Sequence, residues 1–283
     1  MMPMAYLYAI SHWPQGSTSS RGRPKPPASL RSHSFKENSV QNRVVIVTGG
    51  FGILGCAVAA AFEEAGARVA RIDFAPLPQN AKPWDIGGVD LADVAQAKVA
   101  LDVVEDRLGA PSVLVNIAGG FVWQTLEDGG ADAWARMFRM NALTAVTMCK
   151  VAVPRLLQSP SAAIINIGAG AAARADAGMG AYAAAKSAVA RLTESLAAEL
   201  AGQDIRINAV LPSIIDTPTN RADMPSADFT QWVTPQAIAS VILFLASPAA
   251  RAISGALIPT MNGSGSHQGY DCVEEAQARI VVA

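Results

Sequence analysis

The sequence predicts an α/β fold in which a doubly wound, mostly parallel sheet of seven strands carries helices on both faces. Three observations predict it. From Arg43 onward, short apolar runs alternate with stretches of helical spacing, 51% of the 283 residues are hydrophobic while only 16% are charged, and a cluster of glycines follows the first apolar run. Because strands that alternate with helices form right-handed crossover units, we expect the strands to lie parallel and buried on both sides.

Six strands can be located, each a short and largely apolar run that ends at a turn or at a polar side chain. The first run closes at Thr48 and the second at Asp73. In chain order, the expected strands are 44–47, 68–72, 112–116, 162–167, 205–210 and 256–259.

Five helices are expected in this pattern, because alanine, valine and leucine recur in the intervening segments at helical spacing. They span residues 53–64, 94–108, 131–157, 180–200 and 235–246. The segment 224–232 is expected to form either a mobile lid over the binding site or an ordinary surface loop.

The two ends of the chain differ from this pattern. Residues 1–40 hold five basic side chains against one acidic side chain, and prolines and serines interrupt them. Such a segment cannot bury enough apolar surface to offset its chain entropy. We expect a disordered extension there, either a transit peptide or an over-extended translation start, followed by one domain over 41–263 and a short tail over 264–283.

Charge and cysteine content exclude several function classes. A net charge of −1 gives no field that would attract nucleic acid or an anionic membrane, and each long uncharged stretch is broken by glycine, proline or asparagine, unlike a transmembrane span. Cys56, Cys149 and Cys272 lie far apart, and all three histidines lie near the chain ends, so neither a disulfide framework nor a metal site is expected. A reducing cytoplasm is the expected location.

The glycine cluster predicts a dinucleotide site of the Rossmann type. It reads Thr48-Gly49-Gly50-Phe51-Gly52-Ile53-Leu54-Gly55 and lies between a strand and a helix. Glycine lets the backbone approach a pyrophosphate and lets the helix pack closely on the strand, and the helix N-terminus offers free N–H groups to the phosphates. The expected cofactor contacts in this motif are Thr48, Gly49, Gly52, Ile53, Leu54 and Gly55.

Asp73 ends the second strand, eighteen residues beyond Gly55, where the adenosine ribose should lie. A carboxylate there accepts hydrogen bonds from the ribose hydroxyls and repels a 2′-phosphate, so we expect NAD in preference to NADP. Arg71 would soften that preference, but no basic residue directly follows Asp73.

A second motif, Tyr182-Ala183-Ala184-Ala185-Lys186, lies in the fourth expected helix. Side chains four residues apart share one face of a helix, about 6 Å apart along its axis. An ammonium so placed lowers the pKa of a phenol from its ordinary value near 10, and the phenol then serves as a proton donor or acceptor. The ammonium of Lys186 can also hold the nicotinamide ribose.

With these motifs, residues 43–263 resemble the short-chain dehydrogenase/reductase family, which transfers a hydride between a nicotinamide cofactor and a small-molecule substrate. Tyr182 and Lys186 match the catalytic Tyr and Lys of that family, and Asn141 matches the Asn that holds a proton-relay water. The resemblance also implies a homodimer or homotetramer formed through the long helices.

The resemblance implies further cofactor contacts. Asp90-Leu91 looks like the pair that contacts adenine, and Asn116-Ile117-Ala118-Gly119 is similar to the turn that closes the cofactor cleft. In the segment 212–217, the backbone of Ile215 would contact the carboxamide and Thr217 a phosphate. The implied contacts are Asp90, Leu91, Asn116, Ala118, Gly119, Tyr182, Lys186, Pro212, Ile215 and Thr217.

Two departures from the family pattern bear on the substrate. The family serine, thirteen residues before the tyrosine, is Ala169 here, and the glycine spacing is that of the family's extended members. Losing such a hydrogen-bond donor costs about 3 kcal/mol of transition-state stabilisation. Both departures are shared with dihydropteridine reductases, which the chain also resembles across residues 211–232.

We therefore expect an NAD(P)-dependent oxidoreductase that acts on a small carbonyl or alcohol, or on a quinonoid, dihydropterin-like ring, with Tyr182 as the proton donor or acceptor. An enoyl reductase is disfavoured, because that subgroup separates Tyr and Lys by a longer interval. The alternative is a cofactor-binding module of the same fold with little or no turnover, because Ala169 replaces the serine.

Overall fold

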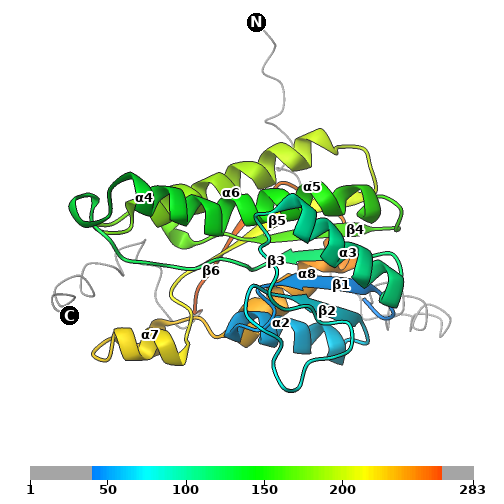
Figure 1. Cartoon of the computed structure of the whole chain (residues 1–283), viewed down its shortest axis with the longest axis horizontal. Coiled ribbons are helices and arrows are strands. Elements are labelled where there is room, and N and C mark those ends of the chain that lie inside the picture. Colours follow the sequence, from blue (N-terminus) through cyan, green and yellow to red (C-terminus); the bar gives the residue numbers. More distant parts are fainter. Residues whose placement is uncertain (1–39, 263–283) are drawn as a thin grey trace, which may run out of the picture. The chain divides into compact units, whose positions relative to one another are not determined.

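The structure is a computed structural model that describes residues 40–262 (Figure 1). Within them, six strands form one sheet in the order β2-β1-β3-β4-β5-β6, and every neighbouring pair is parallel. The doubly wound α/β fold is confirmed, with six strands in this part of the chain where seven were expected. The strands are β1 (Val44–Thr48), β2 (Arg68–Ile72), β3 (Val113–Asn116), β4 (Ala162–Ile167), β5 (Ile205–Pro212) and β6 (Leu257–Thr260).

The expected disordered extension, up to residue 39, and the C-terminal tail lie outside the described residues. No helix within residues 40–262 is long and apolar enough to cross a membrane.

Helices cover both faces of the sheet, as the apolar strands require (Figure 1). The helices α2 (Ile53–Glu64) and α8 (Pro235–Ala246) pack on one face, and α3 (Val94–Leu108), α5 (Thr144–Leu156) and α6 (Gly180–Glu199) pack on the other. Side chains of the central strands alternate between these two layers, and all of them are buried in β1, β3 and β4. Strands buried on both faces are continuous apolar runs for this reason.

The order of the strands reverses beside β1. Because β2 lies on one side of β1 and β3 on the other, the chain leaves the sheet in opposite directions at this point. In doubly wound sheets, ligands bind at such a reversal, outside the carboxyl ends of the strands. Thr48 ends β1 and pairs with Asn116 at the end of β3, so two of the predicted motifs meet there.

The prediction of a single uninterrupted helix over 131–157 is wrong. The structure has α4 (Leu126–Phe138), one wide π-helical turn (Arg139–Leu143) and then α5. Gly130 adopts a positive φ of 51° inside α4, and the hydroxyl of Thr125 accepts a hydrogen bond from the N–H of Asp128 at its start. The helix therefore begins earlier than predicted, and a π-turn, which often marks a functional site, interrupts it at Asn141.

The segment expected to be a lid or a loop begins just after a short helix, α7 (Pro218–Asp223). One 3₁₀ turn (Phe229–Gln231) follows, and Trp232 behind it is buried. Its mobility stays a prediction.

Candidate active site

The glycine turn between β1 and α2 is shaped by close backbone contacts. A Cβ atom added at Gly49 would lie 2.9 Å from the N atom of Ala118, and one at Gly55 would lie 2.1 Å from the carbonyl oxygen of Gly49. Both positions therefore need glycine for packing alone. A Cβ atom at Gly52 would meet nothing closer than 3.4 Å, which is an ordinary contact. The protein's own packing leaves Gly52 unexplained, and a ligand that approaches the backbone there would explain it.

The side chains around this turn hold it against the neighbouring strands. The hydroxyl of Thr48 accepts hydrogen bonds from the N–H groups of Ile117 and Ala118 (3.0 and 3.2 Å). The carboxylate of Asp73 accepts from the N–H groups of Phe51 and Ala75 (2.9 and 3.0 Å). The structure thus brings Asp73 and the glycine turn together, as the sequence predicted.

Tyr182 and Lys186 lie on α6 with Lys186 buried. Its ammonium donates a hydrogen bond to the carbonyl of Ile167 (2.9 Å) and lies 5.9 Å from the centre of the Tyr182 ring. Burial lowers the pKa of Lys186 to about 8 and raises the pKa of Tyr182 to about 12. The expectation that the ammonium lowers the phenol pKa is therefore wrong for this structure, because the desolvation of both groups dominates.

Asn141 occupies the π-turn between α4 and α5. Its side-chain NH₂ donates to the carbonyls of Gly120 and Met137, and its oxygen accepts from the N–H of Gly120 (3.1 Å). A Cβ atom at Gly119 would lie 2.5 Å from that oxygen and 3.5 Å from the ammonium of Lys186. Three predicted positions, 119, 141 and 186, are thus brought together from three different elements.

Comparisons with known proteins find a family model and relatives that cover most of the chain. The family model described as enoyl-(acyl carrier protein) reductase matches residues 52–264. Galactitol 2-dehydrogenase of Rhizobium johnstonii is 35% identical, over 75% of this chain and 91% of its own. Meso-2,3-butanediol dehydrogenase of Serratia marcescens is 31% identical, over 81% and 96%. A solved structure titled short-chain dehydrogenase/reductase SDR:glucose/ribitol dehydrogenase, from Brucella melitensis, covers 78% of this chain and 95% of its own, at 28% identity and a TM-score of 0.67.

The chain belongs to the short-chain dehydrogenase/reductase family. It is therefore an NAD(P)-dependent oxidoreductase, as the sequence predicted. No relative named here is a dihydropteridine reductase, so these relatives do not support the narrower resemblance to that subgroup.

Several cofactor contacts expected from the short-chain dehydrogenase/reductase pattern already have partners within the protein. Asp90 accepts a hydrogen bond from Arg139 (2.6 Å), and the side chain of Leu91 is buried in the core. The hydroxyl of Thr217 accepts from the N–H of Asn220 (3.1 Å) at the start of α7, and the amide of Asn220 donates to the carbonyl of Ile215 (2.7 Å). At these positions, a cofactor would have to bind the backbone groups or the side-chain oxygen lone pairs that these bonds leave open.

The remaining expected positions divide into a buried and an exposed group. Leu54 is buried under the turn, while Ile53 at the first turn of α2 is about half exposed (46%). Asn116 is buried and donates to Asn166 (2.9 Å), and its own side-chain oxygen has no hydrogen-bond partner in the described part of the chain. Pro212 ends β5 and is buried as well.

Sequence reasoning missed the aromatic side chains of Phe121 and Trp123 near Tyr182. The rings of Phe121 and Tyr182 meet edge to face with their centres 5.0 Å apart. The indole N–H of Trp123 donates to the carbonyl of Ala177 (2.9 Å), and Gln124 pairs with Gly178 through the backbone. The only sequence signal was the apolar run Phe121-Val122-Trp123 directly after the turn that follows β3.

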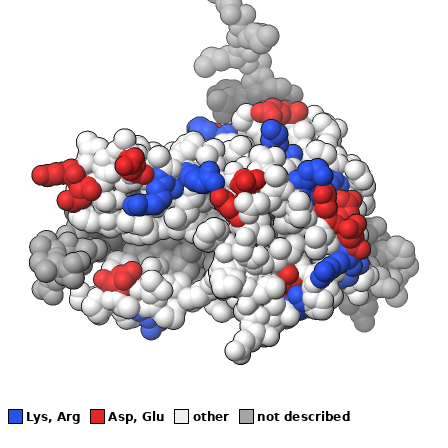
Figure 2. All heavy atoms as spheres, in the orientation of Figure 1, with Lys and Arg blue, Asp and Glu red and all other residues white. Residues whose placement is uncertain are grey.

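Ala169 lies just beyond the end of β4. It is buried, and no residue from 168 to 173 carries a hydroxyl. The segments that lead to α4 and α7 leave the sheet at the carboxyl ends of β3 and β5, and Figure 2 shows a hollow between these two parts whose side chains are mostly uncharged.

Proposed function

We propose that the protein interconverts a secondary alcohol of a small polyol or diol and the corresponding carbonyl compound with NAD(H). One observation carries the proposal. The Lys186 ammonium is buried 5.9 Å from the Tyr182 ring and 3.5 Å from the Cβ position of Gly119, in the turn that Thr48 fastens to the glycine motif. The names of the relatives, a galactitol and a butanediol dehydrogenase, support this substrate class.

The residues around the glycine turn fit a dinucleotide. Gly52 leaves its backbone open to a pyrophosphate, the N-terminus of α2 offers N–H groups, and Asp73 lies at the end of β2 for the ribose hydroxyls. When bound there, NAD supplies a hydride acceptor or donor at its nicotinamide ring.

The protein's own groups supply the proton chemistry. Tyr182 donates the proton to the substrate oxygen during reduction and accepts it during alcohol oxidation. Its pKa of about 12 keeps the phenol protonated at neutral pH, which suits the reductive direction. Alcohol oxidation needs the phenolate, and the burial that raises the phenol pKa opposes its formation at neutral pH. Asn141 holds the turn at Gly120 and in the proposal connects the site to solvent through a water.

Ala169 favours a second candidate. Without a hydroxyl at this position, a carbonyl oxygen has one hydrogen-bond donor fewer, whereas a quinonoid, dihydropterin-like ring needs less polarisation. Phe121, edge to face with Tyr182, offers such a ring an aromatic neighbour.

The proposal is tested by following NADH absorbance with purified protein and three groups of substrates: polyols and diols with NAD, simple ketones, and quinonoid dihydropterins. Replacing the phenol in Tyr182→Phe should lower kcat/KM about a hundredfold or more, the usual contribution of a general acid or base. Ser195→Ala, which removes an exposed hydroxyl from the same helix, is the matched control and should leave the rate unchanged. Turnover with dihydropterins alone would favour the second candidate. Binding of NADH without turnover of any substrate would point to a binding module.

A further inference from the structure

A buried carboxylate holds the one arginine that packs on the glycine turn in the described part of the chain. Asp85 accepts hydrogen bonds from the Nη2 and Nε atoms of Arg71 (2.6 and 3.1 Å), and its own side chain is fully buried (0% exposed). It also accepts from the backbone N–H groups of Arg71 and Lys82 (3.1 and 2.8 Å). Four hydrogen bonds, from four nitrogen atoms of Arg71 and Lys82 to one buried carboxylate, fix the guanidinium in place.

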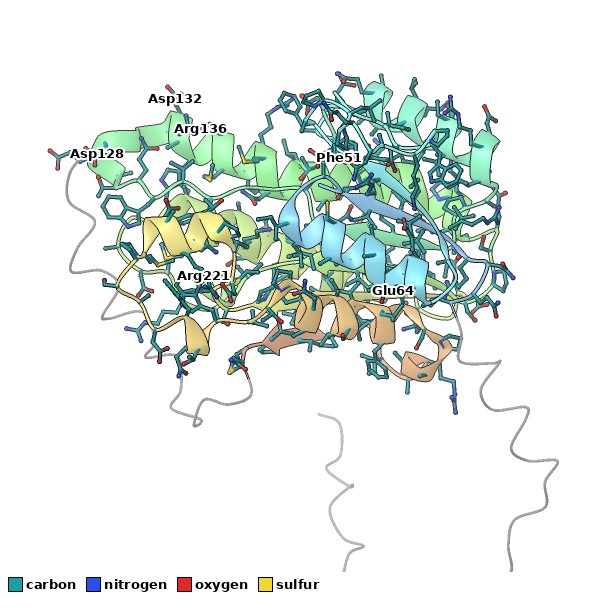
Figure 3. All side chains as sticks on the ribbon, turned by 90° about the horizontal axis from the view of Figure 1, so that it is seen from below. Phe51, Glu64, Asp128, Asp132, Arg136 and Arg221 are labelled. Atoms are coloured by element: carbon teal, nitrogen blue, oxygen red, sulfur yellow. The ribbon has the colours of Figure 1, made fainter. Side chains whose placement is uncertain are left out.

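Arg71 lies close to where the adenosine ribose is proposed to bind. It precedes Asp73 by two residues, so the two side chains leave the same face of the chain about 6.6 Å apart. The guanidinium carbon lies 5.3 Å from the centre of the Phe51 ring, and Asp73 accepts the backbone N–H of that same residue. Figure 3 places Phe51 at the start of α2, at the opposite end of that helix from Glu64.

The ion pairs in this region determine whether a cation near Asp73 is free to bind a phosphate. A free arginine beside Asp73 would be suited to bind a 2′-phosphate through two parallel hydrogen bonds. Arg71 instead forms an ion pair with Asp85, and Lys82 forms one with Glu63. The carboxylate of Asp73, which binds ribose hydroxyls and repels phosphate, keeps no such ion pair in the described part of the chain.

We propose that Asp85 is a positioning residue for cofactor choice: by holding Arg71, it keeps a phosphate-binding cation away from the ribose and so makes the site reject NADP. This inference rests on the proposed NAD site and extends it beyond the strand-end acid. The loop from β2 to α3 thus contributes to cofactor choice from a position fourteen residues away from Arg71.

The test measures binding of NADH and NADPH, which differ only by the 2′-phosphate, through nucleotide fluorescence in the full-length protein. The variants are Asp73→Asn, Asp85→Asn and the two together. Compared with Asp73→Asn alone, the double variant should bind NADPH about tenfold more tightly, a factor equal to about 1.4 kcal/mol. Its affinity for NADH should change less than about twofold, because Asp85 does not face the ribose. Adding Arg71→Gln should remove the gain.

Asp102→Asn is the matched control, since Asp102 is also paired with an arginine, Arg155, but on α3. It should change neither affinity. A double variant that melts like the parent but gains no NADPH affinity would overturn the inference, as would a gain that persists without Arg71.

If Asp85→Asn does not fold, Arg71→Gln in the Asp73→Asn background tests the same claim. With Asp85 present, Arg71 should contribute nothing to NADPH binding, so a large loss of NADPH affinity would refute the inference. If the parent protein binds neither nucleotide, the proposed function fails together with the inference. Normal NADH binding with no effect of Asp85 refutes the inference alone.

Discussion

Ala169 stands where the short-chain dehydrogenase/reductase pattern has a serine. Its backbone is extended (φ −160°, ψ 154°), and its side chain is buried. The nearby hydroxyl of Ser187 donates to the carbonyl of Ala172 (2.7 Å), so it is engaged in holding the segment after β4. In the proposed function, Tyr182 is therefore the side chain that donates a hydrogen bond to the substrate oxygen.

Restoring the missing hydroxyl should separate the two substrate classes. In Ala169→Ser, kcat/KM for a ketone or polyol should rise about a hundredfold, since one such donor is worth about 3 kcal/mol in a transition state. Turnover of a quinonoid ring should change little. Steady-state rates on both substrates measure the effect, with Ala171→Ser in the same turn as control. An unchanged ketone rate would show that the oxyanion does not form beside residue 169.

Lys186 connects two elements, because it belongs to α6 and its ammonium donates to Ile167 at the end of β4. Burial lowers its pKa to about 8, whereas an unfolded lysine titrates near 10.4. Between these values the unfolded chain holds the proton that the folded chain has lost. By linkage, the contribution of this residue to stability must then rise with pH over that interval.

Denaturant unfolding of the parent and of Lys186→Met, from pH 7 to pH 10.5, measures this contribution. The free energy of unfolding of the parent minus that of the variant should be lowest below about pH 8 and should increase toward pH 10.5. Taking the difference cancels the other titrating groups and the constant loss of the bond to Ile167. A difference that does not vary with pH would mean that the ammonium is not desolvated in the folded protein.

At the scale of elements, local patterns were predictable and long-range contacts were not. The glycine turn and the Tyr182–Lys186 pair were found because their geometry follows from a few neighbouring residues. The π-turn at Asn141 was missed, since a continuous apolar pattern cannot show one extra residue in a helical turn. The partner of Arg71 was missed because Asp85 reaches it through an irregular loop that no periodicity describes. Phe121 was missed because its contact to Tyr182 joins two distant segments.

At the scale of the whole molecule, the two ends of the strands have different roles. The carboxyl ends of the strands carry the proposed chemistry, and the amino ends are joined by Arg43, which precedes β1. Its guanidinium donates to the hydroxyl and carbonyl of Ser112 (both 2.9 Å), to the carbonyl of Ser161 (2.7 Å) and to that of Ala246 (2.7 Å). These residues stand before β3, before β4 and at the end of α8. One side chain therefore connects four elements.

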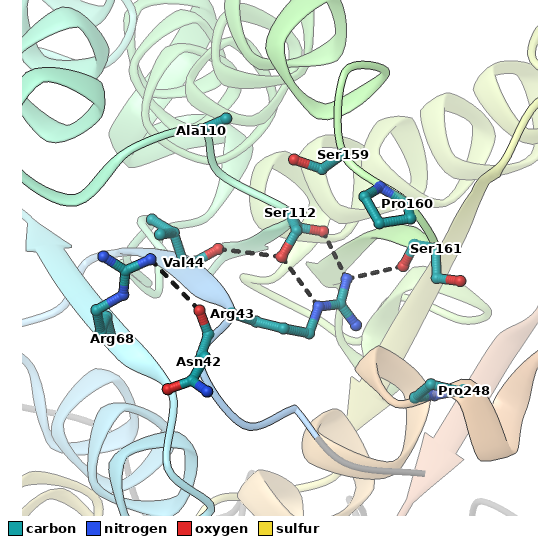
Figure 4. A pocket seen from close by; sticks show the side chains of 10 residues that line it. All are labelled: Asn42, Arg43, Val44, Arg68, Ala110, Ser112, Ser159, Pro160, Ser161 and Pro248. Atoms are coloured by element: carbon teal, nitrogen blue, oxygen red, sulfur yellow. Dashed lines mark hydrogen bonds between the residues drawn. The ribbon is translucent and has the colours of Figure 1, made fainter. Parts of the chain in front are cut away.

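A pocket of about 280 Å³ surrounds this arginine, as Figure 4 shows. Burial, and then the nearby charge of Arg206, lower the pKa of Arg43 to about 10, so the guanidinium stays charged at neutral pH. Arg206 donates to the carbonyls of Leu245 and Ser247 (2.5 and 3.1 Å) beside the end of α8. Cations at a helix C-terminus are favoured by the helix dipole, which explains why two arginines gather there.

Removing this connection should weaken the fold and leave the chemistry intact. In Arg43→Met, four hydrogen bonds from a charged group are lost, but the open pocket lets water reach the carbonyls, so we expect the free energy of unfolding to fall by about 2 kcal/mol. The control is Arg68→Met in the same pocket, because Arg68 makes one long bond there, to the carbonyl of Asn42 (3.4 Å), and an exposed side chain of this kind changes stability by less than about 0.5 kcal/mol. Chemical denaturation measures both variants, and kcat below the melting transition should match the parent in each. Equal stabilities of the two variants would show that the packing at the amino ends of the strands does not depend on Arg43. A lowered kcat in Arg43→Met would show that the amino and carboxyl ends of the strands are coupled.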